Sequence, residues 1–78
     1  LPEGTGSDFK RIEEQVMVEL AINRLPPELK EVAVLFFFQE LRQKEISKIL
    51  GIGLPLVKYR VRRSKELLAD YLREEDTL

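Results

Sequence analysis

The 78-residue sequence contains no cysteine and no histidine. Disulfides, zinc sites built on thiolate or imidazole, and catalysis by either side chain are therefore excluded. No apolar run approaches the roughly 18 residues that a membrane span needs, and there is no signal-peptide pattern. A small fold without disulfides is held by packing alone, which suits a reducing compartment, so we expect a cytoplasmic protein that does not enter a membrane.

Hydrophobic residues make up 44% of the chain and charged residues 35%, the balance of a globular domain rather than a disordered segment. This length allows one domain with one small core. The chain begins with Leu1 rather than Met, so we expect a fragment of a longer protein. An enzyme is the least favoured class, because no glycine motif that could cradle phosphate is present and the carboxylates lie in acidic segments. We expect neither a cofactor nor a metal.

The net charge of -1 hides a strong segregation of charge along the chain. Residues 54–65 hold five bases and no acid, whereas residues 66–78 hold five acids and one base. Solvated helix faces usually mix the two signs through spaced Glu–Lys pairs. A cluster of one sign favours a surface that binds an anion over an ordinary solvated face.

The first helix is predicted from about residue 8 to residue 24, after a linker over residues 1–7 that is rich in Pro, Gly and small polar residues. Ser7 or Asp8 is the expected cap. The spacing of three and four residues predicts an amphipathic helix whose apolar side consists of Phe9, Ile12, Val16 and Leu20.

A second helix is predicted to begin at Pro26-Pro27-Glu28, because proline suits the first helical turn and an acid there complements the helix dipole. Its apolar run, residues 32–38, indicates a central helix wrapped by the others. Three successive phenylalanines, residues 36–38, cannot all point one way on a helix. Either one of them reaches a groove or partner surface, or all three belong to the core.

A short third helix and a long fourth helix follow, and the expected class is an all-α, four-helix domain over residues 8–73. The third helix spans residues 43–50, with Ile46, Ile49 and Leu50 inward, and Gly51 suits the left-handed residue that ends it. The fourth begins at Leu54 or Pro55 and ends near Leu72, before an acidic tail over residues 74–78. Its expected buried side consists of Val57, Val61, Ser64, Leu68 and Tyr71 or Leu72.

The short helix, the glycine turn and the basic last helix together describe a helix-turn-helix, whose second helix lies in the major groove of DNA. Rotation by 100° per residue from Val57 puts Pro55, Lys58, Tyr59, Arg62 and Glu66 on the opposite side. Only the first two or three turns can touch DNA. The basic run ends at Lys65 and the acids begin at Glu66, which is expected because phosphates repel acids within the contact zone.

Each side chain of this surface has an expected role. Arg62 and Lys58 can donate to guanine O6 and N7, and Tyr59 can pack on a thymine methyl or hydrogen-bond a phosphate. The backbone N–H groups near Leu54 and Leu56 can also hold a phosphate, although Pro55 lacks this donor. The expected phosphate contacts, which set register rather than sequence, are Arg63, Lys65, Arg60 and Arg42.

Three segments in order carry a family resemblance. They are LPPELKEVAVLFFFQEL (residues 25–41), KEISKILGI (residues 44–52) and LVKYRVRRSKELL (residues 56–68). Over this stretch the chain resembles region four of bacterial extracytoplasmic-function sigma factors. The resemblance implies binding to the minus-thirty-five promoter element, docking on the flap of the RNA polymerase β subunit and, in many members, sequestration by an anti-sigma factor. By position it implies a base-reading group of Lys58, Tyr59, Arg62 and Arg63.

Several positions depart from the family pattern. Pro55-Leu56 stands where the family often has Gly-Thr, which removes a hydroxyl usually available to a phosphate. Tyr59 replaces a serine, Arg62 replaces a histidine or phenylalanine, and Arg42 stands where a small cap residue is common. These changes fall on the reading surface, so the promoter sequence stays open.

Two other functions compete with this interpretation. A response-regulator output domain of the LuxR type also uses a four-helix helix-turn-helix, but it binds paired half-sites as a dimer. A protein-interaction module would instead present the basic helix to an acidic protein partner. The Leu-Pro-Pro opening and the apolar second helix favour the sigma-factor interpretation.

Overall fold

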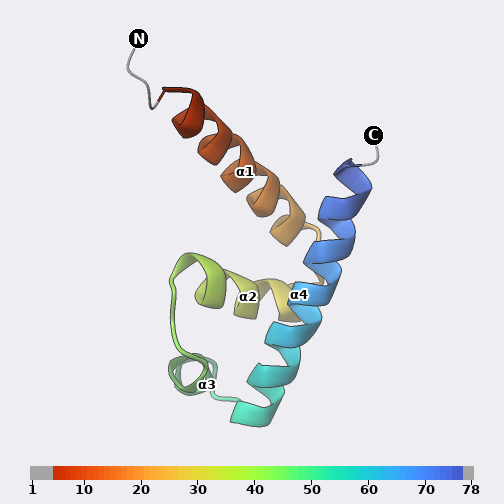
Figure 1. The fold of residues 1–78 in the computed structure, drawn as a ribbon. Helices are drawn as coiled ribbons and strands as arrows, with labels where there is room; N and C mark the ends of the chain where they lie inside the picture. Colours follow the sequence, from red (N-terminus) through yellow and green to blue (C-terminus); the bar gives the residue numbers. More distant parts are fainter. Residues whose placement is uncertain (1–4, 77–78) are drawn as a thin grey trace.

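The computed structural model describes the backbone of residues 5–76 and the side chains of residues 10–74. Residues 5–76 form four α-helices, with one π-helical turn after the second. Figure 1 shows how the helices are arranged. Over this described part there is no strand, and the expected all-α class is confirmed. The elements are α1 (Thr5–Asn23), α2 (Pro27–Ala33), η1 (Val34–Phe38), α3 (Gln43–Leu50) and α4 (Leu54–Asp76).

The helix boundaries differ from expectation at both ends of the domain. α1 begins at Thr5, inside the segment expected to be a linker, so neither Ser7 nor Asp8 caps it. Acidic and hydroxyl residues are favoured throughout a first turn, so they leave the starting residue uncertain by a few positions. α4 continues to Asp76, past the expected end near Leu72 and into the acidic tail. No helix within residues 5–76 is long and apolar enough to cross a lipid bilayer.

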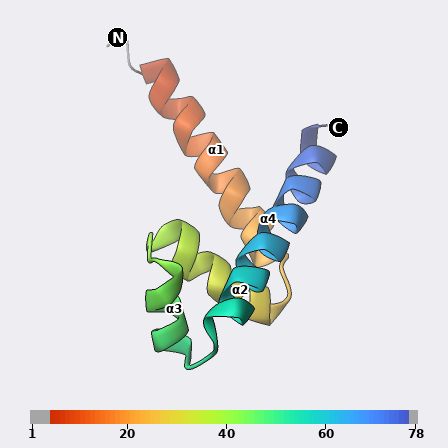
Figure 2. The same ribbon diagram turned by 60° about the horizontal axis from the view of Figure 1, so that its bottom comes forward.

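α1 packs on the opposite side from the one expected. Ile12, Val16 and Leu20 are 59%, 46% and 59% exposed, whereas Ala21 and Ile22 are buried. Rotation by 100° per residue places these two apolar sets on nearly opposite sides of the helix. In Figures 1 and 2, α1 approaches α4 at its C-terminal end and the two helices then diverge. Only the last turns of α1 therefore select the buried side.

A polar contact fixes the end of α1 to the C-terminal half of α4. The Arg24 guanidinium lies 4.1 Å from the centre of the Tyr71 ring. The same group donates from Nη2 to Glu74 Oε2 at 3.1 Å. Arginine stacked on an aromatic face gains from both the ring quadrupole and its packing area. This contact joins the two helices where they begin to diverge.

α2 begins as expected, with Pro27 in the first turn and Glu28 beside it. The predicted continuous helix is interrupted at η1, where the Gln39 N–H donates to the Val34 carbonyl, five residues back, at 3.1 Å. This wider turn separates the three phenylalanines. Phe36 and Phe37 are half-buried with ring centres 5.0 Å apart in an edge-to-face arrangement, while Phe38 is 40% exposed. The alternative in which one ring lies outside the core is therefore the correct one.

The core consists of two clusters along the buried side of α4. The α1–α2–α4 cluster contains Ala21, Ile22, Leu25, Leu29, Ala33 and Leu68, with Phe37 packed against it. The α2–α3–α4 cluster contains Val32, Ile46, Val57 and Val61, with Phe36 packed against it. Edge-to-face contact between Phe36 and Phe37 links the two clusters. α2 and α4 contribute buried side chains to both.

Ser64 lies between the clusters and is fully buried. Its hydroxyl donates to the Arg60 carbonyl oxygen one turn back, at 2.7 Å, and lies 3.4 Å from the Leu29 carbonyl oxygen of α2. The hydroxyl is thereby satisfied without water. A residue this small lets α2 approach α4 closely, so the expected inward position of Ser64 is confirmed.

The phenylalanines of η1 provide a stability test. Phe36→Ala should lower the free energy of unfolding by about 3 kcal/mol, the lower end of the range for phenylalanine truncation, because the ring is half-buried. Phe38→Ala is the matched control in the same turn and should cost about 1 kcal/mol or less. Urea denaturation of both variants measures the difference. Equal losses would show that η1 does not orient Phe36 toward the core as described.

Candidate nucleic-acid interface

α3, a tight turn and the N-terminal half of α4 form a helix-turn-helix, which Figure 2 shows with the turn brought forward. Ile46 of α3 is fully buried against Val57 and Val61 of α4, so the angle between the helices is set by packing. Ile49, which was expected to point inward, is 59% exposed. An eight-residue helix offers only about two turns to its neighbour, and Ile46 occupies the contact.

The turn itself is fixed by the backbone. Gly51 adopts a left-handed conformation, with φ of 66°, as the sequence predicts. Ser47 and Ile52 exchange two hydrogen bonds across it, because the Ser47 hydroxyl donates to the Ile52 carbonyl at 2.5 Å and the Ile52 N–H donates to the Ser47 carbonyl at 3.2 Å. The carbonyl of Gly53 then accepts from the first turn of α4. These contacts hold α4 rigidly relative to α3.

The outer side of α4 carries the basic cluster. The expected buried positions Val57, Val61, Ser64 and Leu68 are all buried. The cations in between are consequently directed outward: Arg60 is half-buried, and Lys58, Arg62, Arg63 and Lys65 are exposed. Helical periodicity therefore predicted the orientation of the whole cluster from its apolar positions.

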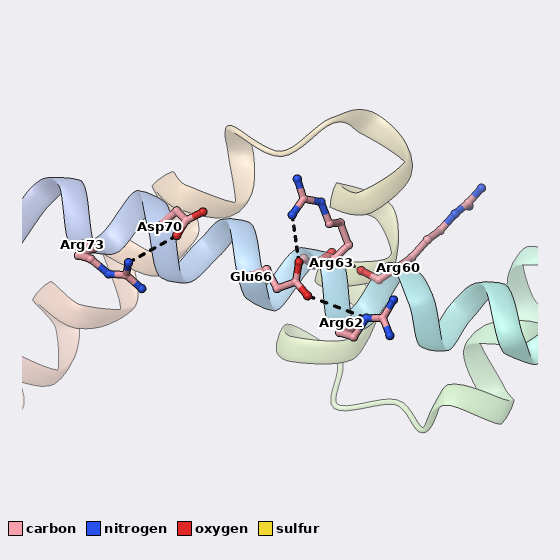
Figure 3. Close-up of polar contacts among 7 residues, drawn as sticks. Arg60, Arg62, Arg63, Glu66, Asp70 and Arg73 are labelled. Carbon is pink, nitrogen blue, oxygen red and sulfur yellow. Dashed lines mark hydrogen bonds and ion pairs between the residues drawn. The ribbon is translucent and has the colours of Figure 1, made fainter.

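Glu66, the first acid after the cluster, lies beside two of its cations. Its Oε2 accepts a hydrogen bond from Arg63 Nη1 at 3.0 Å, and its Oε1 lies 3.9 Å from Arg62 Nε. Figure 3 shows the carboxylate between the two guanidinium groups, while Arg60 extends away from it. The spacing of three and four residues along one helix brings these side chains together. Two of the five cations are thus partly compensated within α4.

Two cations of the cluster contact aromatic rings. The Arg62 guanidinium carbon lies 5.5 Å from the centre of the Tyr59 ring, which is 49% exposed. Lys65 Nζ lies 5.2 Å from the centre of the Phe36 ring. Lys65 therefore stands on the flank of α4 that faces η1. Sequence reasoning missed this contact, because the path of the chain after α2 was needed to find it.

The remaining predicted residues lie around the turn. Arg42 is exposed and precedes α3, where its backbone N–H donates to Glu45 Oε1 at 3.0 Å. Pro55 is exposed and Leu56 is 39% exposed. The Leu56 N–H already donates to the Gly53 carbonyl at 3.1 Å, which corrects its expected role as a free phosphate donor. Leu56 offers the surface an apolar side chain instead.

The assembled surface can bind an extended anion. A single rigid helix presents Lys58, Arg62 and Arg63 along its first three turns, with Tyr59 among them. Exposed cations on such a rod attract phosphates at a distance, and guanidinium groups provide directional donors at contact. The geometry fits a helix inserted into a groove lined by phosphates.

Comparison with known proteins gives concordant findings. A model of the family "Sigma-70, region 4" matches residues 15–68 of the chain. The chain is also 36% identical over 55 residues to the "ECF RNA polymerase sigma factor SigE" of Mycolicibacterium smegmatis. That alignment covers 70% of this chain and 21% of the relative, so the chain spans about a fifth of the relative's length.

The rigidity of the turn is testable at its glycines. Gly51→Ala should lower the free energy of unfolding by about 1–2 kcal/mol, because a Cβ is disfavoured in the left-handed conformation. A Cβ there would meet nothing within 4 Å, so the cost comes from the backbone rather than from a clash. Gly53→Ala, whose Cβ would make only an ordinary 3.7 Å contact with Pro55, is the control. Gly53→Ala should lower the free energy of unfolding by about 0.5 kcal/mol. Chemical denaturation separates the two, and equal costs would contradict this account of the turn.

Proposed function

We propose that this chain, which belongs to the Sigma-70 region 4 family, recognises the minus-thirty-five promoter element as the C-terminal domain of an alternative sigma factor. The observation that carries the proposal is the basic outer side of α4, held at a fixed angle to α3 by the Gly51 turn. Family membership supplies the kind of nucleic acid. The surface supplies a way to bind it, and the function needs neither a cofactor nor a metal.

The first turns of α4 would enter the major groove and α3 would cross the backbone beside it. Lys58 and Arg62 are proposed to donate to guanine, and Tyr59 to pack on a thymine methyl. The remaining cations, Arg42, Arg60, Arg63 and Lys65, are proposed to hold phosphates and fix the register. By its position in the family pattern, Arg63 is a further candidate for base contact. Leu56 would add an apolar contact beside Pro55.

The ion pairs in the free domain do not prevent this use of the cations. The side chains of Arg62, Arg63 and Glu66 are 70%, 45% and 52% exposed. Pairs this exposed contribute about 0.2–1 kcal/mol. A good bidentate contact from arginine to guanine discriminates by about 1–3 kcal/mol, so base recognition outweighs release of the pair.

Docking on the flap of the RNA polymerase β subunit is proposed as the second half of the function. The domain has exposed apolar side chains outside α4 that suit a protein partner: Ile12, Val16, Leu20 and Phe38. An anti-sigma factor would be a competing partner for the domain. This function would place the protein in the cytoplasm with the polymerase.

Selection of bound duplexes from a random pool, with and without polymerase core, tests the function. We expect one enriched element, bound by a monomeric chain and bound more tightly when core is present. Enrichment of paired half-sites by a dimer would favour the LuxR-type alternative. Failure to enrich any sequence, together with tight binding to an acidic protein, would favour an interaction module.

Two single substitutions separate base reading from phosphate binding. Arg62→Ala should specifically weaken binding to the selected duplex, by about 1–3 kcal/mol, because it removes a guanine contact. Lys65→Ala should weaken binding to all duplexes about equally, because it removes a phosphate contact. It should also lower, by about one, the slope of the logarithm of the binding constant against the logarithm of salt concentration. Competition binding against random duplex measures both. Intact discrimination in Arg62→Ala would show that another residue reads the base.

A further inference from the structure

We propose that Glu66 is a specificity-determining residue, whose carboxylate competes with DNA phosphates for Arg62 and Arg63 and so limits binding to nonspecific sequence. The inference rests on the proposed function and adds a role that the basic residues alone do not have. It starts from the position of an acid on the surface that would face DNA. Glu66 lies one turn beyond Arg62 on the same outer side of α4, as Figure 3 shows.

The carboxylate engages both arginines at once. Oε2 accepts from Arg63 Nη1 at 3.0 Å, and Oε1 faces Arg62 Nε at 3.9 Å. The side chain that carries this carboxylate is 52% exposed. A phosphate that approaches Arg63 Nη1 therefore meets a negative charge that already occupies that donor, and one that approaches Arg62 meets the same carboxylate 3.9 Å from Nε. Each exposed pair of this kind favours the paired arrangement of its side chains by about 1.4- to fivefold.

The Glu66 carboxylate affects the two modes of DNA binding differently. At Arg62 it faces Nε, which leaves both terminal Nη groups free to address O6 and N7 of guanine. Binding of a phosphate by Arg63 through Nη1 uses a donor that now faces Glu66. Base reading by Arg62 can thus coexist with the Glu66 carboxylate, whereas phosphate binding has to displace it. Nonspecific complexes, which depend on phosphates, are penalised more than the specific complex.

Asp70 supplies an internal comparison. It lies one turn further along α4 and pairs with Arg73, with Nη1 to Oδ1 at 3.8 Å. Figure 3 shows this pair separate from the Glu66 group. Its side chain is 58% exposed, close to that of Glu66. Glu66→Gln and Asp70→Asn remove the same charge from the same helix, so a difference between them reports on proximity to the basic cluster.

The experiment titrates the 78-residue chain and the two variants against a fluorescent duplex of random sequence, at salt concentrations from about 50 to 200 mM. Glu66→Gln should bind about five- to tenfold more tightly than the parent at the lowest salt, with a slope steeper by about one for each additional phosphate that the chain neutralises. If one additional phosphate is neutralised, the advantage should shrink by about three- to fourfold at the highest salt. Asp70→Asn should stay within about twofold of the parent, with an unchanged slope.

The selected duplex provides the second readout. In Glu66→Gln, affinity for the selected duplex should rise less than affinity for random duplex. The ratio of selected-duplex affinity to random-duplex affinity should therefore fall. Thermal unfolding of both variants controls for destabilisation of α4 by loss of its ion pairs. Equal random-duplex affinities and slopes for Glu66→Gln and Asp70→Asn would overturn the inference, as would no binding by Glu66→Gln at the lowest salt. Failure of the parent chain to prefer any sequence would instead overturn the proposed function.

Discussion

The packing of α4 on α2 is the constraint on which the remaining structure depends. One continuous helix contributes Val57 and Val61 to one cluster and Leu68 to the other, with the buried Ser64 between them. Because its inner positions are committed to the core, its outer positions are fixed as well. The orientation of the basic side chains of α4 follows from that packing. The Gly51 turn then sets the direction in which α4 points. Stability and the proposed DNA recognition therefore depend on the same helix.

The sequence predicted the part of the fold where pattern and chemistry agree. Proline at the start of α2, glycine after α3 and a single apolar stripe on α4 each have one structural interpretation. α1 was misread because it carries two apolar sides, and only its meeting with α4 decides which one is buried. The π-helical turn could not be predicted, because a run of three phenylalanines fits several backbones equally well.

The residues of the candidate site were easier to predict from the sequence than the charge interactions among them. Counting charges over residues 54–65 located the cations, and Glu66 was identified as the first acid after them, but its pairing with Arg62 and Arg63 was not predicted. The spacing of Glu66 from Arg62 and Arg63 was the available signal, since residues three and four apart share a side of a helix. By contrast, the approach of Lys65 to Phe36 joins positions far apart in the chain, and periodicity carries no information about it.

The division of the core into two clusters has a mechanical consequence. Among the described residues, α1 contributes to one cluster and α3 to the other, while α2 and α4 span both. Detachment of α1 would uncover Ile22 but leave Ile46 of α3 packed against α4. Such opening is a sub-global event with its own lower free energy, so amide hydrogens of α1 would exchange with solvent sooner than those of the helices beneath it. A force applied at the N-terminal end of α1 would detach α1 before it disturbed the turn that orients α4.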